Sequence, residues 1–274
     1  MSFKNLITIS RPRFWLYLFG PFLIGVAAAP LAVSLPLLLL AIYFTLPANL
    51  LIYGVNDLFD YETDKLNPKK RGYEEMVAPE RQKNLRNYIL AFNVPFLALL
   101  PFLPSVAIYS LLLFWFFGIF YSAKPIRAKT KPIIDSFFNI LYIFPGLVAF
   151  GIGANKWPYI AIIISGTLWC MAMHAFSAVP DIASDKKAHM RTIATLLGRS
   201  GTIVFCMLAY VLAAVLVWQY IGWYSALCGL IYAGMMLLAL KTKDTQKLFK
   251  LYTYFPVINA ALGFGLFVLT VLAQ

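Results

Sequence analysis

Charged residues are scarce in this chain. Lysine, arginine, aspartate and glutamate make up 12% of its 274 residues, whereas hydrophobic residues make up 61% and the mean hydropathy is +0.77. This composition excludes a water-soluble protein and indicates an integral membrane protein. Cysteine is scarce too. Cys170, Cys206 and Cys228 all lie in apolar stretches, so they neither require a disulfide nor form a metal-binding motif.

Long apolar runs recur along the whole chain. A helix needs about 20 apolar residues to cross a bilayer. The runs predict an all-α, polytopic membrane protein with nine transmembrane helices. We place these helices at residues 14–33, 35–55, 85–103, 105–122, 134–154, 158–179, 201–220, 222–240 and 250–273.

The basic residues are distributed unevenly over the predicted loops. Among the 23 lysines and arginines, only Lys156 falls on the side opposite to the N-terminus. The positive-inside rule therefore places the N-terminus and the loops on its side in the cytoplasm, and the C-terminus outside. All 11 acidic residues also fall on the cytoplasmic side, which the rule does not require. Their placement indicates a polar site there.

A cluster of aspartates directly follows the apolar run 41–55. Asp57, Asp60 and Asp64 are spaced i, i+3 and i+7, so on a continuous helix their carboxylates would share one face. Carboxylates at the end of a membrane span are costly unless a cation neutralises them. Mg²⁺ fits, because it prefers carboxylate oxygens and keeps positions open for phosphate. Asn56 would bind the metal or hold Asp60 in place.

A second acidic pair, Asp181 and Asp185, ends another apolar run with spacing i, i+4. Two clusters facing one pocket would hold Mg²⁺ ions that bridge a diphosphate. A short segment with two prolines, on the same side of the membrane, supplies cations for such a group. These cations are Lys124, Arg127, Lys129 and Lys131.

Four features have two interpretations each. Asp135 is either a third site carboxylate or the N-cap of the following helix, and we favour the cap. His174 is a structural residue or part of a pocket. The run Lys69–Arg71 is a lid over diphosphate or a lipid-facing basic loop. Arg11 and Arg13 are topology anchors or phosphate contacts.

Together, these motifs resemble the UbiA superfamily of intramembrane prenyltransferases. The resemblance covers essentially the whole chain. It rests on Asn56-Asp57-x-x-Asp60-x-x-x-Asp64, on Asp181-x-x-x-Asp185, on the segment from Tyr121 to Lys129 and on the nine predicted spans. Within the superfamily, the runs 123–136 and 174–185 are similar to the lycopene elongases of carotenoid synthesis.

The resemblance implies one domain over residues 1–274, with helices around a central cavity and a cytoplasmic cap. It also implies Mg²⁺-dependent transfer of a prenyl group from an allylic diphosphate to a lipophilic acceptor from the bilayer, such as lycopene. The protein would lie in the cell membrane, in contact with lipid, and would bind no nucleic acid. A quinone ring precursor, haem or a glycerol ether as acceptor, and a non-catalytic transporter, are the alternatives.

The resemblance also implies roles for individual residues. The metal ligands and catalytic residues would be Asp57, Asp60, Asp64, Asp181 and Asp185. The diphosphate would contact Asn56, Tyr121, Lys124, Arg127, Lys129 and Lys186. The prenyl or acceptor pocket would include Tyr53, His174 and Phe176. Lys124 stands where relatives often have proline, so the phosphate ligand among Lys124, Arg127 and Lys129 stays open.

Overall fold

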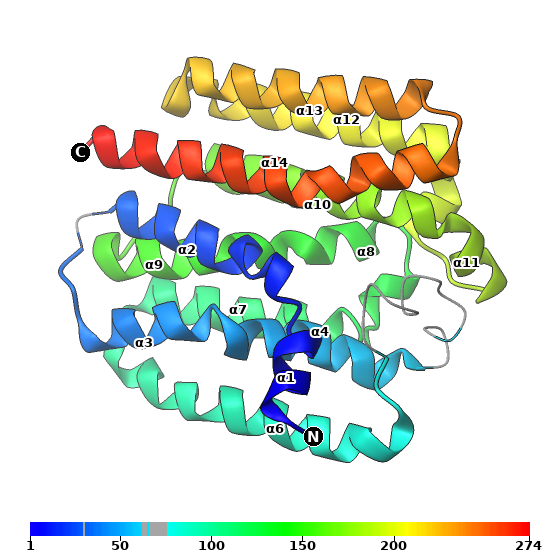
Figure 1. The fold of residues 1–274 in the computed structure, drawn as a ribbon. Helices are drawn as coiled ribbons and strands as arrows, with labels where there is room; N and C mark the ends of the chain where they lie inside the picture. Colours follow the sequence, from blue (N-terminus) through cyan, green and yellow to red (C-terminus); the bar gives the residue numbers. More distant parts are fainter. Residues whose placement is uncertain (30, 62–64, 66–75) are drawn as a thin grey trace. The chain divides into compact units, whose positions relative to one another are not determined.

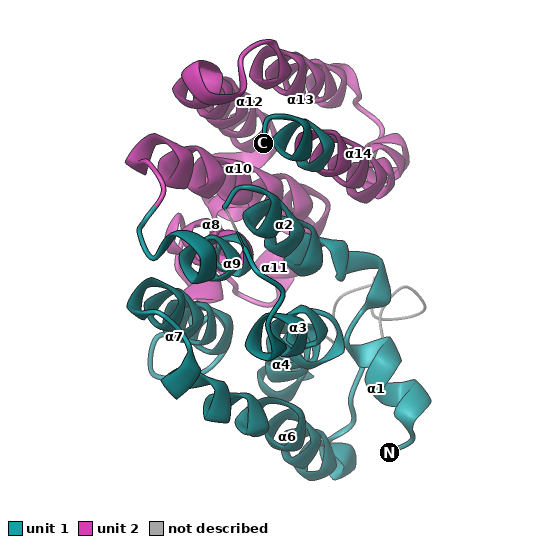
Figure 2. Cartoon of the chain, turned by 90° about the vertical axis from the view of Figure 1, so that its left-hand side faces the viewer, with its two compact units in different colours: residues 1–127, 144–157, 267–274 teal, residues 128–143, 158–266 magenta. Residues whose placement is uncertain are grey.

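A computed structural model gives the structure of the chain and describes residues 1–29, 31–61, 65 and 76–274. Within these residues every regular element is a helix, as the apolar runs predict (Figure 1). The described residues form two compact units (Figure 2). Unit 1 comprises residues 1–127, 144–157 and 267–274, and unit 2 comprises residues 128–143 and 158–266.

Unit 1 begins with a short helix and continues with longer apolar ones. Its helices are α1 (Phe3–Ile9), the 3-10 turn η1 (Pro12–Phe14), α2 (Leu16–Ala27), α3 (Leu35–Tyr43), α4 (Leu46–Phe59), α6 (Pro79–Asn93), η3 (Val94–Phe102), α7 (Ser105–Phe120) and α9 (Phe144–Ala154). The Ser2 hydroxyl caps α1 and the Ser34 hydroxyl caps α3, each by accepting a backbone N–H bond from the first turn. Polar caps therefore mark where these two helices begin.

Close backbone contact joins three helices of unit 1. Helix α2 lies beside α9, and α9 lies beside α7 (Figure 1). A Cβ atom at Gly25 of α2 would collide with the carbonyl oxygen of Gly146 in α9. A Cβ atom at Gly151 of α9 would lie 2.9 Å from the backbone nitrogen of Ala107 in α7. Small residues allow this approach, as is common between helices in membranes.

Unit 2 is built around α10. Its elements are η4 (Ala128–Thr130), α8 (Ile134–Phe137), η5 (Phe138–Ile143), α10 (Ile160–Ala178), η6 (Val179–Asp181), α11 (Ile182–Lys187), α12 (Ile193–Ile221), α13 (Trp223–Lys241) and most of α14 (Thr245–Leu272). Helix α12 packs against both α10 and α13. In the core of unit 2 the rings of Tyr210 and Tyr232 stack with centroids 4.4 Å apart. The Tyr232 hydroxyl donates to Asn259 Oδ1 at 2.8 Å.

Seven helical segments of the described residues are long and apolar enough to cross a membrane. They correspond to seven of the predicted spans. The predicted spans 14–33 and 105–122 instead coincide with shorter apolar helices, at Pro12–Ala27 and Ser105–Phe120. A multi-pass membrane protein is thus established, while the count of nine spans stays a prediction.

Candidate active site

The first aspartate cluster lies where α4 ends. Asp57 is in the last turn of the helix and Asp60 is its C-cap residue; they are 2% and 4% exposed. Asp57 and Asp60 do not share one continuous helical face, because Asp60 leaves the helical region (φ −114°, ψ 2°) and α4 ends at Phe59. Asp64 lies outside the described residues.

Arg11 forms an ion pair with Asp57 of this cluster. Its Nη2 atom donates to Asp57 Oδ1 at 3.3 Å, and its guanidinium carbon lies 4.6 Å from the centroid of the Tyr53 ring. Arg11 has φ 52°, in the left-handed region, directly before Pro12. Sequence reasoning left Arg11 between a topology anchor and a phosphate contact and did not foresee this pairing. Tyr53, predicted to line the pocket, is 8% exposed and faces the guanidinium.

Asn56 connects the end of α4 to the segment that follows α7. Its Nδ2 donates to the hydroxyl of Ser122 at 3.1 Å, and Ser122 is buried. Tyr121, which precedes Ser122 in the chain and is the C-cap of α7, is half-buried. This hydrogen bond attaches the beginning of the predicted phosphate-binding segment to the first aspartate cluster, within unit 1.

The basic segment itself is irregular, as its two prolines predict. Lys124 is exposed and precedes a cis peptide bond to Pro125, Arg127 is half-buried with φ 46°, and Lys129 in η4 is 4% exposed. The three candidates for the phosphate ligand thus differ strongly in burial. The run Lys69–Arg71 lies outside the described residues.

The second acidic pair lies beyond the end of α10, in unit 2. Asp181 ends η6 and is the N-cap of α11, which carries Asp185 and, exposed, Lys186. Both aspartates are half-buried. Thr192, the N-cap of α12, donates from Oγ1 to Asp185 Oδ2 at 3.4 Å. The start of α12 therefore helps to orient Asp185.

Asp135 has a different role from the N-cap that we favoured. The N-cap of α8 is Ile133, and Asp135 lies in the first turn of that helix. Its side chain is fully buried, and Oδ2 accepts the backbone N–H of Ile193, the first residue of α12, at 2.7 Å. The cap interpretation was wrong for α8: the carboxylate instead serves the N-terminus of another helix.

The two predicted pocket residues of α10 differ in their surroundings. His174 Nε2 lies 3.9 Å from Asp135 Oδ2, and the His174 side chain is 14% exposed. Phe176 is fully buried, and its ring packs against Phe255 with centroids 5.3 Å apart. In this structure Phe176 is therefore part of the core of unit 2.

The described residues contain no group of three or more histidine, cysteine, aspartate or glutamate side chains arranged to hold a metal ion. The end of α4 nevertheless fits a divalent cation. Buried carboxylates there lie at the helix end that carries negative partial charge, where anions are disfavoured. Oxygen donors of this kind are the ligands that Mg²⁺ prefers.

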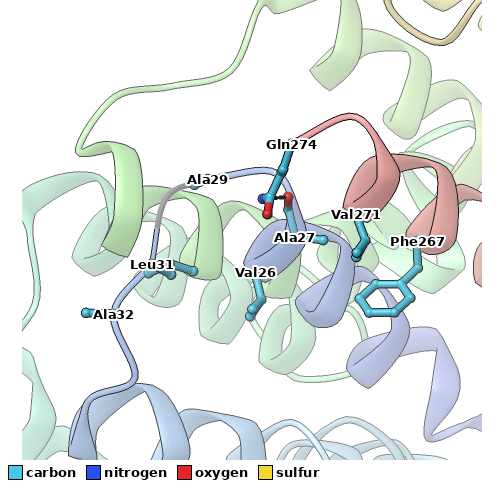
Figure 3. Close-up of a pocket in the computed structure, with 8 residues that line it drawn as sticks. All are labelled: Val26, Ala27, Ala29, Leu31, Ala32, Phe267, Val271 and Gln274. Atoms are coloured by element: carbon cyan, nitrogen blue, oxygen red, sulfur yellow. Dashed lines mark hydrogen bonds between the residues drawn. The ribbon is translucent and has the colours of Figure 1, made fainter.

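One apolar pocket lies elsewhere in unit 1 (Figure 3). It has a volume of about 670 Å³ and is lined by Val26, Ala27, Ala29, Leu31, Ala32, Phe267, Val271 and Gln274. The Gln274 side-chain amide donates to the carbonyl oxygen of Ala27. No predicted site residue lines this pocket, so it is separate from the aspartate cluster.

These observations define a class: a multi-pass, all-helical membrane protein with buried aspartates at the end of an apolar helix. The family model described as the UbiA prenyltransferase family matches residues 18–257. The chain belongs to the UbiA prenyltransferase family and is a prenyltransferase.

Curated relatives and solved structures agree with this assignment. The chain is 37% identical to a lycopene elongase/hydratase of Haloarcula japonica, over 94% of this chain and 88% of the relative. It is 35% identical to a lycopene elongase/hydratase of Halobacterium salinarum, over 95% of this chain and 94% of the relative. A UbiA homolog from Archaeoglobus fulgidus, solved with GPP and Mg²⁺, matches with a TM-score of 0.70 and 19% identity, over 96% of this chain and 99% of that one. At that identity the likeness concerns the fold.

Proposed function

We propose that the chain transfers a C5 prenyl group from an allylic diphosphate to a long apolar polyene such as lycopene, with Mg²⁺ as cofactor. The observation that carries this proposal is the pair of buried aspartates, Asp57 and Asp60, at the negative end of α4. The names of the relatives from Haloarcula japonica and Halobacterium salinarum support the polyene acceptor.

Asp57, Asp60, Asp64, Asp181 and Asp185 would be the Mg²⁺ ligands. When bound, Mg²⁺ supplies a Lewis acid for the charge that develops on a leaving diphosphate. The structure of the Archaeoglobus fulgidus homolog with GPP and Mg²⁺ supports this assignment. Asn56 would hold the acidic turn in place through its bond to Ser122.

Fixed cations and polar groups would bind the diphosphate oxygens. The candidates are Asn56, Tyr121, Lys124, Arg127, Lys129 and Lys186. Preorganised positive charge in a site without bulk water stabilises a leaving anion strongly. Among the basic candidates, exposed Lys124 and Lys186 would capture the donor, whereas Lys129, at 4% exposure, would act as a fixed charge.

The apolar interior of the spans would protect the allylic cation from water. The ring of Tyr53, which already faces a guanidinium, suits a cation, and His174 would be a polar residue of the acceptor pocket. A phenolic or carboxylate-bearing acceptor would require paired polar groups deep in the spans. The few polar residues there favour a polyene.

Expression in two host cells tests the acceptor. In cells that accumulate lycopene, we expect elongated carotenoids that depend on Mg²⁺ and on the donor in membrane extracts. Cells that lack their own quinone prenyltransferase should stay deficient in quinone. Restored quinone synthesis without any new carotenoid would refute the polyene acceptor and leave the family assignment unchanged.

We also propose that residues 1–274 form one functional domain in the cell membrane, with nine transmembrane helices around a central cavity. The N-terminus and the loops that carry the aspartates would be cytoplasmic, and the C-terminus would lie outside. Cysteine labelling in intact cells tests this orientation. Lys156→Cys should react with an impermeant reagent and Lys124→Cys should not; the opposite result would invert the topology.

A further inference from the structure

Asp135 is at the centre of a buried polar cluster in unit 2. Its side chain is fully buried, and each of its two oxygens accepts one backbone N–H. Oδ1 accepts from Ser136 at 2.8 Å, and Oδ2 accepts from Ile193 at 2.7 Å. Ile193 is the first residue of α12, so the carboxylate also lies at the helix end that favours negative charge. Backbone groups therefore fix this carboxylate in place.

His174 is the imidazole that this carboxylate faces. Nε2 of His174 lies 3.9 Å from Asp135 Oδ2, and the side chain is 14% exposed. His174 precedes Asp181 by seven residues along α10 and η6. At a rise of 1.5 Å per residue this places it roughly 10 Å along the helix axis from the proposed metal ligand.

Ser136, whose backbone N–H bonds Asp135, also carries a buried hydroxyl group. Its side chain is fully buried, and Oγ makes no hydrogen bond to any described residue. Buried hydroxyl groups are nearly always paired, so a small polar molecule such as water is the expected partner. The carboxylate that faces His174 is thus fixed, and the next residue in the chain carries a hydroxyl group that suits bound water.

The proposed reaction leaves a charge that must be removed. As the donor's carbon–oxygen bond breaks, diphosphate keeps the electron pair. The electrons of an acceptor double bond then form the new carbon–carbon bond, and the neighbouring acceptor carbon becomes a cation. Either this cation loses a proton from an adjacent carbon, or water adds to it. The names of the relatives, which join elongation with hydration, favour water.

We infer that His174 is the base of this last step, and this inference rests on the proposed polyene acceptor. A water oxygen forms a bond to the acceptor cation, one of its O–H bonds breaks, and the proton goes to the imidazole of His174. The imidazolium that results is stabilised by the Asp135 carboxylate, as in other histidine–carboxylate pairs. The products are a tertiary alcohol and a protonated imidazole, which later returns its proton to solvent.

The ratio of two products tests this role. Wild type, His174→Gln and Asp135→Asn are expressed in cells that accumulate lycopene, and elongated carotenoids with and without a hydroxyl group are quantified by mass spectrometry. Loss of a general base typically costs about 100-fold or more. We expect the hydroxylated-to-unhydroxylated ratio to fall by about that factor in His174→Gln. A smaller decrease is expected in Asp135→Asn.

The matched control is His189→Gln, which changes the chain's other histidine, an exposed residue, and should keep the wild-type ratio. A purely structural His174 would lower both products in parallel, so an unchanged ratio in His174→Gln overturns the inference. If His174→Gln does not accumulate in the cells, the inference is overturned by an unchanged hydroxylated-to-unhydroxylated ratio in Asp135→Asn. A wild type that makes only unhydroxylated products also overturns it. If wild type makes no elongated carotenoid, the proposed function itself fails.

Discussion

The end of α4 in unit 1 and the start of α12 in unit 2 each hold a buried carboxylate, but they neutralise it by different means. Asp57 is paired with a side chain, the guanidinium of Arg11 at 3.3 Å. Asp135 is paired with the backbone N–H groups of Ser136 and Ile193. The first partner is the end of a long side chain that can move, and the second is fixed by the helix.

The ends of the two helices explain this difference. A carboxylate near a helix C-terminus meets negative partial charge and needs an external cation, whereas one near an N-terminus is stabilised by the helix itself. Asp57 is therefore suited to exchange one cation for another, such as Arg11 for Mg²⁺. Asp135 is suited to hold α12 and to orient His174.

The largest effect is expected from removing the charge of Asp57. Asp57→Asn should lower Mg²⁺-dependent diphosphate release by about 1,000-fold or more, because electrostatic stabilisation of a leaving group is usually the largest single contribution to catalysis. Asp181→Asn should do the same. Both variants should remain folded in detergent, as measured by size-exclusion chromatography. Near-normal turnover at limiting Mg²⁺ would refute the metal-ligand assignment.

The second effect concerns stability at the other carboxylate. Asp135→Asn should lower the free energy of unfolding by about 1.5–3 kcal/mol, the range for a hydrogen bond to a charged group. Chemical denaturation in detergent measures this loss. Asp57→Asn should lose less unfolding free energy than Asp135→Asn, because the partner of Asp57 is exchangeable and the partners of Asp135 are fixed. An equal loss in the two variants would contradict this distinction.

Arg11→Gln tests the exchange of cations directly. Without the competing guanidinium, the affinity for Mg²⁺ in the absence of donor should rise by about fivefold, since an ion pair of this kind contributes roughly 1 kcal/mol. Titration calorimetry with Mg²⁺ alone measures this. Arg13→Gln is the matched control, because the Arg13 guanidinium lies 4.7 Å from the Phe14 ring centroid. An unchanged or weaker affinity in Arg11→Gln would contradict the exchange.

The smallest effect is expected at the N-cap of α12. Thr192 caps this helix through Thr195 and also donates to Asp185. Thr192→Val should cost about 1 kcal/mol of stability through the lost cap. Thr202→Val, which removes a hydroxyl bonded to the carbonyl of Gly198 in the same helix, is the control for a generic threonine loss. Equal Mg²⁺ affinities in the two variants would show that Thr192 does not orient Asp185.

The sequence predicts well those features that depend on neighbours in the chain. The apolar runs before Asp57 and Asp181 predict helices that end close to these residues, and α4 and α10 do end there. Arg11 was left undecided because its contact with Asp57 spans 46 residues, and an arginine before a span is also a common topology anchor.

Asp135 and Asp60 show where local patterns fail. The preference of aspartate for N-caps suggested that Asp135 begins a helix, but its partner Ile193 is 58 residues away, and such a contact leaves no periodic pattern. The spacing of Asp57, Asp60 and Asp64 suits a helix, yet α4 ends at Phe59. No proline or glycine within the motif signals that end.

The contacts at Gly25 and Gly151 have a consequence for how substrates arrive. Helices α2, α9 and α7 meet backbone to backbone at these positions, and even one added carbon would collide there. A hydrocarbon chain is wider than one added carbon, so it cannot pass between α2 and α9 at Gly25 or between α9 and α7 at Gly151. The proposed lipid-soluble acceptor would therefore have to reach Asp57 and Asp60 by a route that does not pass between these helices at Gly25 or Gly151.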